Sequence, residues 1–154
     1  MFHSLSFSRL PVLFLAMGTA AAFTLPVLAG NPERANLTVR VQGLNSNQGQ
    51  VIARVFRSAQ GFPGQPERAL RSQTVPVQRG QAVLRFADLP AGSYAVAVAH
   101  DQNNNGELDF NVLGIPSEGV GFSNNPRLLF GPPAFDVAAV WLREDRSIAI
   151  KAVY

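Results

Sequence analysis

The feature that most constrains this chain is a strict alternation of apolar and polar residues that begins near Ala35. Leu37, Val39 and Val41 are separated by polar residues. Successive side chains of a strand point to opposite faces, so this pattern predicts a strand with one buried face and one wet face. The pattern recurs between turns rich in Gly, Pro and Asn. The predicted strands cover 37–42, 50–57, 73–78, 81–86, 93–100, 138–142 and 147–153, and the last two are expected to form a hairpin around Glu144 and Asp145.

Composition agrees with short strands and many turns. The chain has 13 Gly and 11 Pro, and only 15% of its residues are charged, against about 25% in soluble domains. Long surface helices and coiled coils are therefore disfavoured. We predict an all-β fold, an antiparallel Ig-like or transthyretin-like β-sandwich of about seven strands. Ala95, Ala97 and Ala99 share one face of the 93–100 strand, which indicates a central strand that another layer approaches closely.

The first 29 residues differ from the rest of the chain. A short segment that carries Arg9 is followed by the uncharged stretch 10–29, and Val27-Leu28-Ala29 precedes Gly30. This order is typical of a secretory signal peptide. We predict a signal peptide at 1–29 and a single domain at 30–154. The alternative is an uncleaved membrane anchor, because about 18 uncharged apolar residues can span a bilayer.

Charge and cysteine content narrow the compartment and the partners. Twelve of the 13 cations are Arg, and they are scattered along the chain. Phosphate binding needs a concentrated basic face, so nucleic acid is not expected as a partner. The chain has no Cys, which excludes disulfides and is compatible with the bacterial envelope. We expect a periplasmic or secreted bacterial protein that meets a membrane only if its signal stays attached.

The segment 101–109 has the spacing of a calcium loop. Oxygen-bearing side chains occupy positions 1, 3, 5 and 9, a glycine occupies position 6, and the ligand at position 7 would be a backbone carbonyl. Calcium prefers many oxygen ligands arranged in this way. The predicted ligands are Asp101, Asn103, Asn105, the carbonyl of Glu107, and Asp109.

The same loop departs from an EF-hand at its last position. Val112 stands where a bidentate Glu would close the site, and Asp101 and Asp109 are the two carboxylates among the side-chain ligands. Any affinity should therefore fall near the extracellular range, roughly 10⁻⁴ to 10⁻³ M. The alternative is a plain Asn-Gly turn whose amides bind their own backbone without metal.

A hydrolytic site is the second chemical possibility. His100 is the only histidine after residue 29, it adjoins Asp101, and Glu118 follows in the next loop. The chain lacks a Gly-x-Ser-x-Gly nucleophile elbow, so the usual context of a catalytic serine is missing. A hydrolase that uses His100, Asp101 and Glu118 remains the alternative to a non-catalytic protein.

The long segment after His100 is rich in Gly, Pro and Phe. Phe122, Phe130 and Phe135 could form an aromatic rim that binds a ligand, or fold back as a lid over one end of the sandwich. Earlier in the chain, Leu89-Pro90-Ala91-Gly92-Ser93-Tyr94 suggests a tyrosine corner, in which the hydroxyl of Tyr94 returns to nearby backbone.

Five segments of the chain together carry a family resemblance. They are Phe86 to Val96, His100-Asp101 with its Asn-Gly loop, Gly114-Ile115-Pro116-Ser117-Glu118-Gly119, Gly121-Phe122-Ser123-Asn124-Asn125 and Phe130-Gly131-Pro132-Pro133. These segments resemble the domain of unknown function 2141 family of exported bacterial proteins. The resemblance runs from about residue 37 to residue 153, and it implies a secreted β-sandwich without an assigned activity. The motif at 89–94 is also similar to strand starts in transthyretin-like and carboxypeptidase-regulatory-like sandwiches.

The sequence therefore predicts a non-catalytic binding or accessory module of the bacterial envelope. No cofactor is expected apart from calcium. The partner would be an envelope protein, a glycan or a small molecule, and the residues do not distinguish among them.

Overall fold

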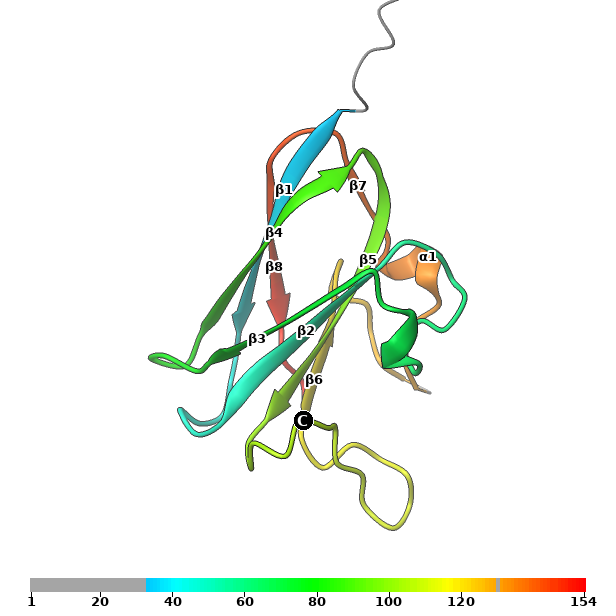
Figure 1. The fold of residues 1–154 in the computed structure, drawn as a ribbon. Helices are drawn as coiled ribbons and strands as arrows, with labels where there is room; N and C mark the ends of the chain where they lie inside the picture. Colours follow the sequence, from blue (N-terminus) through cyan, green and yellow to red (C-terminus); the bar gives the residue numbers. More distant parts are fainter. Residues whose placement is uncertain (1–32, 130) are drawn as a thin grey trace, which may run out of the picture.

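The structure is a computed structural model that describes residues 33–129 and 131–154. Eight strands form two sheets, as the alternation predicted (Figure 1). The chain order is β1 Arg34–Gln42, β2 Gln50–Phe56, a 3-10 turn at Pro66–Arg68, β3 Arg71–Pro76, β4 Ala82–Pro90, β5 Gly92–Asp101, β6 Gly119–Phe122, α1 Phe135–Ala138, β7 Val140–Leu142 and β8 Arg146–Lys151.

The smaller sheet has the order β4-β1-β8, and the larger has the order β3-β2-β5-β6, with β7 pairing with the start of β5. The neighbours are antiparallel except for β1 and β8, which run parallel, with Val39 opposite Ile148. The predicted sandwich is thus confirmed with one parallel pair. The predicted strands correspond to seven of the eight, and β6 lies in a segment where the sequence predicted no strand.

The predicted terminal hairpin is wrong. β7 pairs with β5 of the larger sheet, whereas β8 pairs with β1 of the smaller sheet. The turn at Glu144 and Asp145 therefore carries the chain from one sheet to the other. Asp145 holds this crossing in place, because its carboxylate accepts hydrogen bonds from the backbone N–H and the side-chain amide of Asn36 at 2.8 and 2.9 Å.

The main core lies between the two sheets. Leu37, Val39 and Val41 of β1 are at most 1% exposed and face Val96 and Val98 of β5. Burying each such aliphatic side chain contributes about 1.5–3 kcal/mol. Alternation along the strands therefore fixes which face of each sheet turns inward.

Tyr94 makes the predicted tyrosine corner. Its ring is fully buried, and its hydroxyl donates to the carbonyl of Pro90 at 2.5 Å. Burial raises the pKa of Tyr94. The hydrogen bond fixes the tight connection between β4 and β5, so the motif at 89–94 has a structural role.

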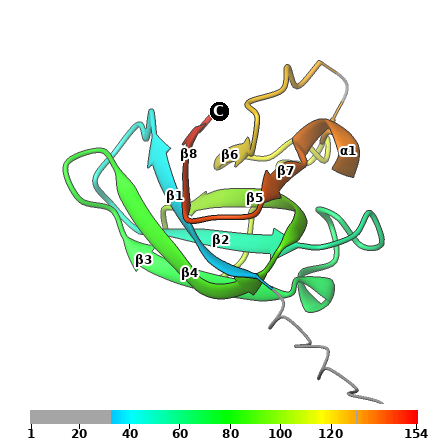
Figure 2. The same cartoon turned by 90° about the horizontal axis from the view of Figure 1, so that it is seen from above.

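A second, smaller apolar cluster covers part of the outer face of the larger sheet. Ala95 and Phe122 pack there against Ala138 of α1, together with Phe62 and Phe135. In both ribbon views α1 lies beyond β5, on the side away from β1 and β4 (Figures 1 and 2). This cluster is the close second layer that the alanines of β5 predicted.

The predicted signal peptide at 1–29 lies outside the described residues. Within 33–129 and 131–154, no helix is both long and apolar enough to cross a membrane.

Candidate functional site

The loop that follows β5 is organised around Asp101. This carboxylate is fully buried and accepts hydrogen bonds from Gln50 Nε2 at 2.8 Å, the N–H of Gly106 at 2.8 Å and the N–H of Asn105 at 3.1 Å. Burial alone would raise the pKa of Asp101, but these donors outweigh it and hold the pKa below its ordinary value. The ionised carboxylate therefore folds the loop back onto the end of β2.

The remaining predicted calcium ligands lie in the same turn. Asn103 Nδ2 and Asn105 Nδ2 donate to the two oxygens of Asp109 at 2.6 and 3.0 Å. The amide oxygen of Asn103 accepts from the N–H of Asn105, and that of Asn105 accepts from the N–H of Glu107. The four side chains at 101, 103, 105 and 109 are thus brought into one hydrogen-bonded loop.

These contacts fit a self-sufficient Asx turn, and a cation would have to displace the amide donors from Asp109. In the described part of the chain, no three His, Cys, Asp or Glu side chains form a group that could hold a metal. The predicted ligand set instead uses two Asn side chains and the carbonyl of Glu107, so calcium binding by this loop stays a prediction.

Glu118 joins this loop to the start of β6. It is 5% exposed, and its two oxygens accept hydrogen bonds from the N–H groups of Gln102 at 2.8 Å and Asp109 at 3.2 Å. The carboxylate thus serves as the acceptor for two backbone groups at opposite ends of the loop.

His100 is held among packed side chains. It is 1% exposed, its Nε2 lies 2.8 Å from the carbonyl of Gln48, and its Nδ1 lies 2.6 Å from the hydroxyl of Tyr154. A carbonyl only accepts, so Nε2 donates to Gln48, and in the neutral imidazole Nδ1 then accepts from the hydroxyl of Tyr154. The hydroxyl of Tyr154 in turn accepts from the N–H of Asn45 at 3.1 Å. One neutral tautomer satisfies the whole chain of hydrogen bonds.

The three residues of the hydrolase alternative therefore have separate tasks. His100 bonds to Tyr154 and Gln48, and neither carboxylate, Asp101 nor Glu118, is among its partners. Among the serines that the structure describes, none is hydrogen-bonded to His100 either. This arrangement lacks the base and nucleophile pair that hydrolysis by these residues would need.

The feature that sequence reasoning missed is an apolar groove on the outer face of the larger sheet. Its volume is about 650 Å³, within the range of small-molecule sites. Its floor comes from β5 and β6, where Ala97 pairs with Phe122 and Ala99 pairs with Val120. The flanking groups come from the loop around 110–116, from residues 128–129 and 131–132, and from Pro63 and Gly64.

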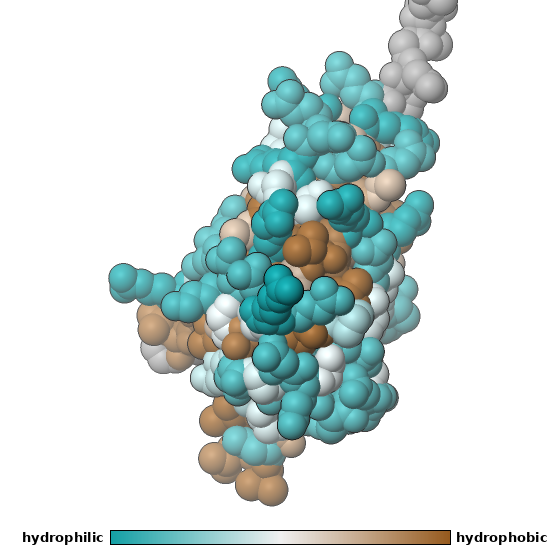
Figure 3. Space-filling model, turned by 90° about the vertical axis from the view of Figure 1, so that its left-hand side faces the viewer, coloured by the Kyte–Doolittle hydropathy of each residue, from teal (hydrophilic) through white to brown (hydrophobic). Residues whose placement is uncertain are grey.

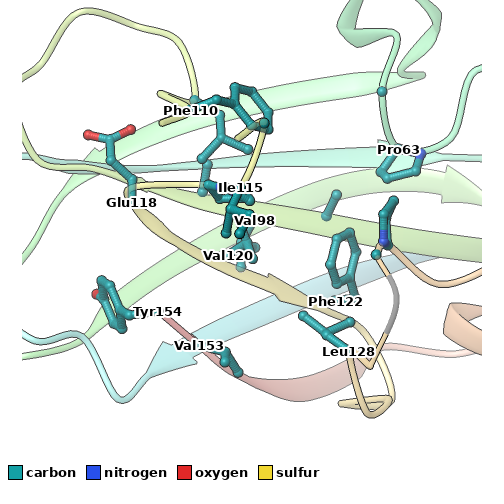
Figure 4. A pocket seen from close by; sticks show the side chains of 18 of the residues that line it. Pro63, Val98, Phe110, Ile115, Glu118, Val120, Phe122, Leu128, Val153 and Tyr154 are labelled. Atoms are coloured by element: carbon teal, nitrogen blue, oxygen red, sulfur yellow. The ribbon is translucent and has the colours of Figure 1, made fainter. Parts of the chain in front are cut away.

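The two ends of the groove differ. Figure 4 shows Phe122, Leu128 and Pro63 toward one end, and Glu118 and Tyr154 toward the other. Gly119 allows Tyr154 to lie close to β6, because a Cβ at residue 119 would stand 2.5 Å from the ring atom Cζ. The C-terminal residue therefore forms part of the groove and at the same time binds His100.

Exposed apolar side chains continue from the groove onto the loop between β5 and β6. Phe110, Val112, Leu113 and Ile115 are all more than half exposed. Figure 3 shows hydrophobic side chains at the lower end of the molecule, where Figure 1 places this loop. Exposed apolar groups gathered beside a groove mark interaction surfaces more often than isolated ones do.

The three phenylalanines of the predicted aromatic rim do not all belong to one described site. Phe122 and Phe135 lie edge-on to Phe62, with ring centroids 6.0 and 5.9 Å away. Both rings pack in the apolar cluster on the outer face of the larger sheet, and Phe122 also lines the groove. Phe130 is outside the described residues.

The motif Ser123-Asn124-Asn125 is structural. Ser123 exchanges hydrogen bonds with the backbone of Val96, and Asn124 donates to the carbonyls of Val137 and Ala139. Asn124 and Asn125 have φ angles of 65° and 48°, a region that Asn tolerates better than most residues. These three residues fix the segment that carries one wall of the groove.

A family model described as "Uncharacterized protein conserved in bacteria (DUF2141)" matches residues 39–150. The chain belongs to this family. The match runs from the second half of β1 through most of β8 and includes the loop at 101–109, the groove floor and the Ser123-Asn124-Asn125 motif. No curated protein and no solved structure matches the chain.

Proposed function

We propose that this DUF2141 protein is an exported, non-catalytic binding module of the bacterial envelope, and that it holds an apolar small molecule in the outer-face groove. The observation that carries the proposal is the groove itself, about 650 Å³ in volume and lined mainly by apolar residues. Such a cavity with few polar groups is the common form of a ligand site. The exposed loop beside it supplies further apolar surface.

The groove favours an apolar small molecule over a glycan or an envelope protein. Sugar hydroxyls need several convergent polar groups, whereas Ala97, Ala99, Val120 and Leu128 offer none. The hydrogen bonds of His100 and Glu118 support a non-catalytic role, since both side chains already have structural partners.

The proposal is tested by titrating the protein with a neutral fluorescent probe, N-phenyl-1-naphthylamine. We expect probe fluorescence to rise on binding to wild type. Ala97→Phe, which fills the floor, should weaken binding at least about tenfold. Ala149→Phe is the matched control, because Ala149 is exposed on β8 of the other sheet.

Far-ultraviolet circular dichroism verifies that both variants fold. If the Ala97→Phe variant does not fold, Ala97→Leu introduces a smaller side chain at the same position. Equal binding by wild type and Ala97→Phe would contradict the proposal, and so would the absence of any fluorescence change in wild type.

Export rests on the sequence of residues 1–29. We expect the protein recovered from the bacterial envelope to begin at Gly30 when its N-terminus is sequenced. Recovery of a chain that still begins at Met1 in the membrane fraction would instead support the anchor alternative.

A further inference from the structure

We infer that the ligand of the outer-face groove is a single-chain anionic amphiphile, such as a fatty acid, whose carboxylate pairs with Arg54. This inference rests on the proposed function and names the chemical class of its ligand. It comes from the position of Arg54, the one cation among the described residues that line the groove.

Arg54 stands on β2 opposite Ala97 of β5 and Ser72 of β3. Ala97 is in turn opposite Phe122 of β6, so Arg54 belongs to the row of the sheet that contains Phe122. Among residues 33–129 and 131–154 the one ion pair is Arg34 with Asp88. Arg54 therefore has no carboxylate partner within the described chain, although it is partly buried.

The other charged group in the groove is at the far end. Glu118 directly precedes β6, whose first residue Gly119 pairs with His100, and it lies four residues before Phe122 in the chain. At about 3.3 Å per residue, four residues correspond to about 13 Å. The carboxylate of Glu118 is already engaged by two N–H groups, so Arg54 is the charge in the groove that lacks a partner.

The surface between these two ends is apolar, and its floor is formed by small side chains. Ala97 and Ala99 project little from β5, and Val120, Ile115 and Leu128 flank them in the groove (Figure 4). An extended hydrocarbon chain can lie along such a floor, and removal of its methylene groups from water favours binding. A charged head at the Arg54 end would point away from Glu118. The geometry thus favours an anion with one alkyl chain over a cation or a glycan.

The test displaces N-phenyl-1-naphthylamine with two surfactants of equal chain length, dodecanoate and dodecyltrimethylammonium, below their micelle-forming concentrations. We expect wild type to bind dodecanoate about fivefold more tightly, which is the upper end of the range for a partly exposed charge pair. Added salt should reduce that preference. Arg54→Gln should abolish the preference while the neutral probe still binds, and Arg54→Lys should retain most of it.

Arg40→Gln serves as the matched control, because Arg40 is exposed on β1 of the smaller sheet. Equal affinities for the two surfactants in wild type would overturn the inference. So would a preference for dodecanoate that survives in Arg54→Gln. Both results leave the proposed function standing as long as Ala97→Phe still loses the neutral probe. Failure of wild type to bind the neutral probe refutes the proposed function itself.

Discussion

At Asp101, one buried carboxylate closes a whole loop through three N–H donors, from Gln50, Asn105 and Gly106. Gly49 lies directly against this site, since a Cβ there would stand 2.1 Å from the carbonyl oxygen of Asp101. Substitution of either residue should therefore disturb the junction between β2, β5 and the loop, even though neither residue lines the groove.

The pH dependence of stability tests this role of Asp101. The pKa of Asp101 is lower in the folded than in the unfolded chain, so it stabilises the fold above about pH 4, and this contribution is lost as pH falls through the folded value. We expect Asp101→Asn to lower the free energy of unfolding at neutral pH by about 2 kcal/mol, because it replaces an ionised acceptor of three donors. The free energy of unfolding of the variant, measured by urea titration, should also fall less steeply with decreasing pH than that of wild type.

Asp136→Asn is the control, since Asp136 is exposed on α1. If Asp101→Asn unfolds with the same acid dependence as wild type, the carboxylate is not the group that closes the loop.

Both tyrosines give a second test at the residue scale. Burial raises the pKa of Tyr94, and for Tyr154 burial and the nearby Glu118 carboxylate raise the pKa against an opposing N–H donor from Asn45. A raised folded pKa means that the stabilisation is complete below about pH 10 and is lost as pH rises through the folded value. Ultraviolet titration should show tyrosinate forming at higher pH in the native protein than in denaturant. Coincident curves would contradict the packed positions of these rings.

At the scale of the elements, the free edge of β8 is hydrogen-bonded by the side chain of Asn125. Asn125 Nδ2 donates to the carbonyl of Ala149 at 2.9 Å, and its Oδ1 accepts from the N–H of Lys151 at 2.7 Å. The amide thus replaces a neighbouring strand. The opposite edge of the sandwich has a similar device, since the side-chain amide of Gln73 on β3 bonds to the N–H and carbonyl of Arg85 on β4.

Replacing Asn125 should therefore loosen β8. We expect Asn125→Gly to lower the free energy of unfolding by about 1–2 kcal/mol, because two backbone groups lose their partner while glycine still accepts the positive φ. Asn125→Ala should cost more, since alanine adds backbone strain. Hydrogen exchange at the Lys151 amide should accelerate in both variants. Unchanged exchange there would show that the side chain does not complete the edge.

For the loop at 101–109, the calcium hypothesis predicts a rise in melting temperature in millimolar Ca²⁺ relative to EDTA. At about 100 times the dissociation constant, binding to the folded form alone adds about 2.7 kcal/mol. Asp109→Asn should remove the effect while Asp101 keeps its structural contacts. Superimposable wild-type melts would contradict the hypothesis and leave the hydrogen-bonded turn as the full description of this loop.

The sequence predicted elements better than it predicted their partners. Alternation at Leu37, Val39 and Val41 identified β1, but alternation is local and does not say which strand pairs with which. The final hairpin was therefore predicted wrongly. β6 was missed because Gly119–Phe122 is four residues long and contains two glycines, which gives too short a pattern to read.

On the scale of the whole molecule, the candidate ligand site lies outside the sandwich core. The C-terminal segment links the two sheets, since β8 pairs with β1 and Val153 then exchanges backbone hydrogen bonds with Val120 of β6. This link places Tyr154 at one end of the groove. The core between the sheets is filled by apolar side chains that include Phe86 and Tyr94, whereas the groove lies on the outer face of the larger sheet.

The groove could not be predicted from the sequence, because the residues of its floor come together only through the pairing register of separate strands. Arg54, Ala97 and Phe122 are far apart in the chain and meet only when β2, β5 and β6 pair. The one signal in the sequence was the row of alanines on β5, which indicated a close second layer. α1 and its neighbours supply that layer over Ala95, and the groove occupies the face beside Ala97 and Ala99.

The most direct test of the groove is a titration of ¹⁵N-labelled protein with dodecanoate, followed by the amide resonances. We expect the largest shifts at Ala97, Ala99 and Val120, with small shifts at Val39 and Ile148 in the other sheet. Uniform small shifts, or shifts centred on the smaller sheet, would contradict the assignment of the outer-face groove as the ligand site.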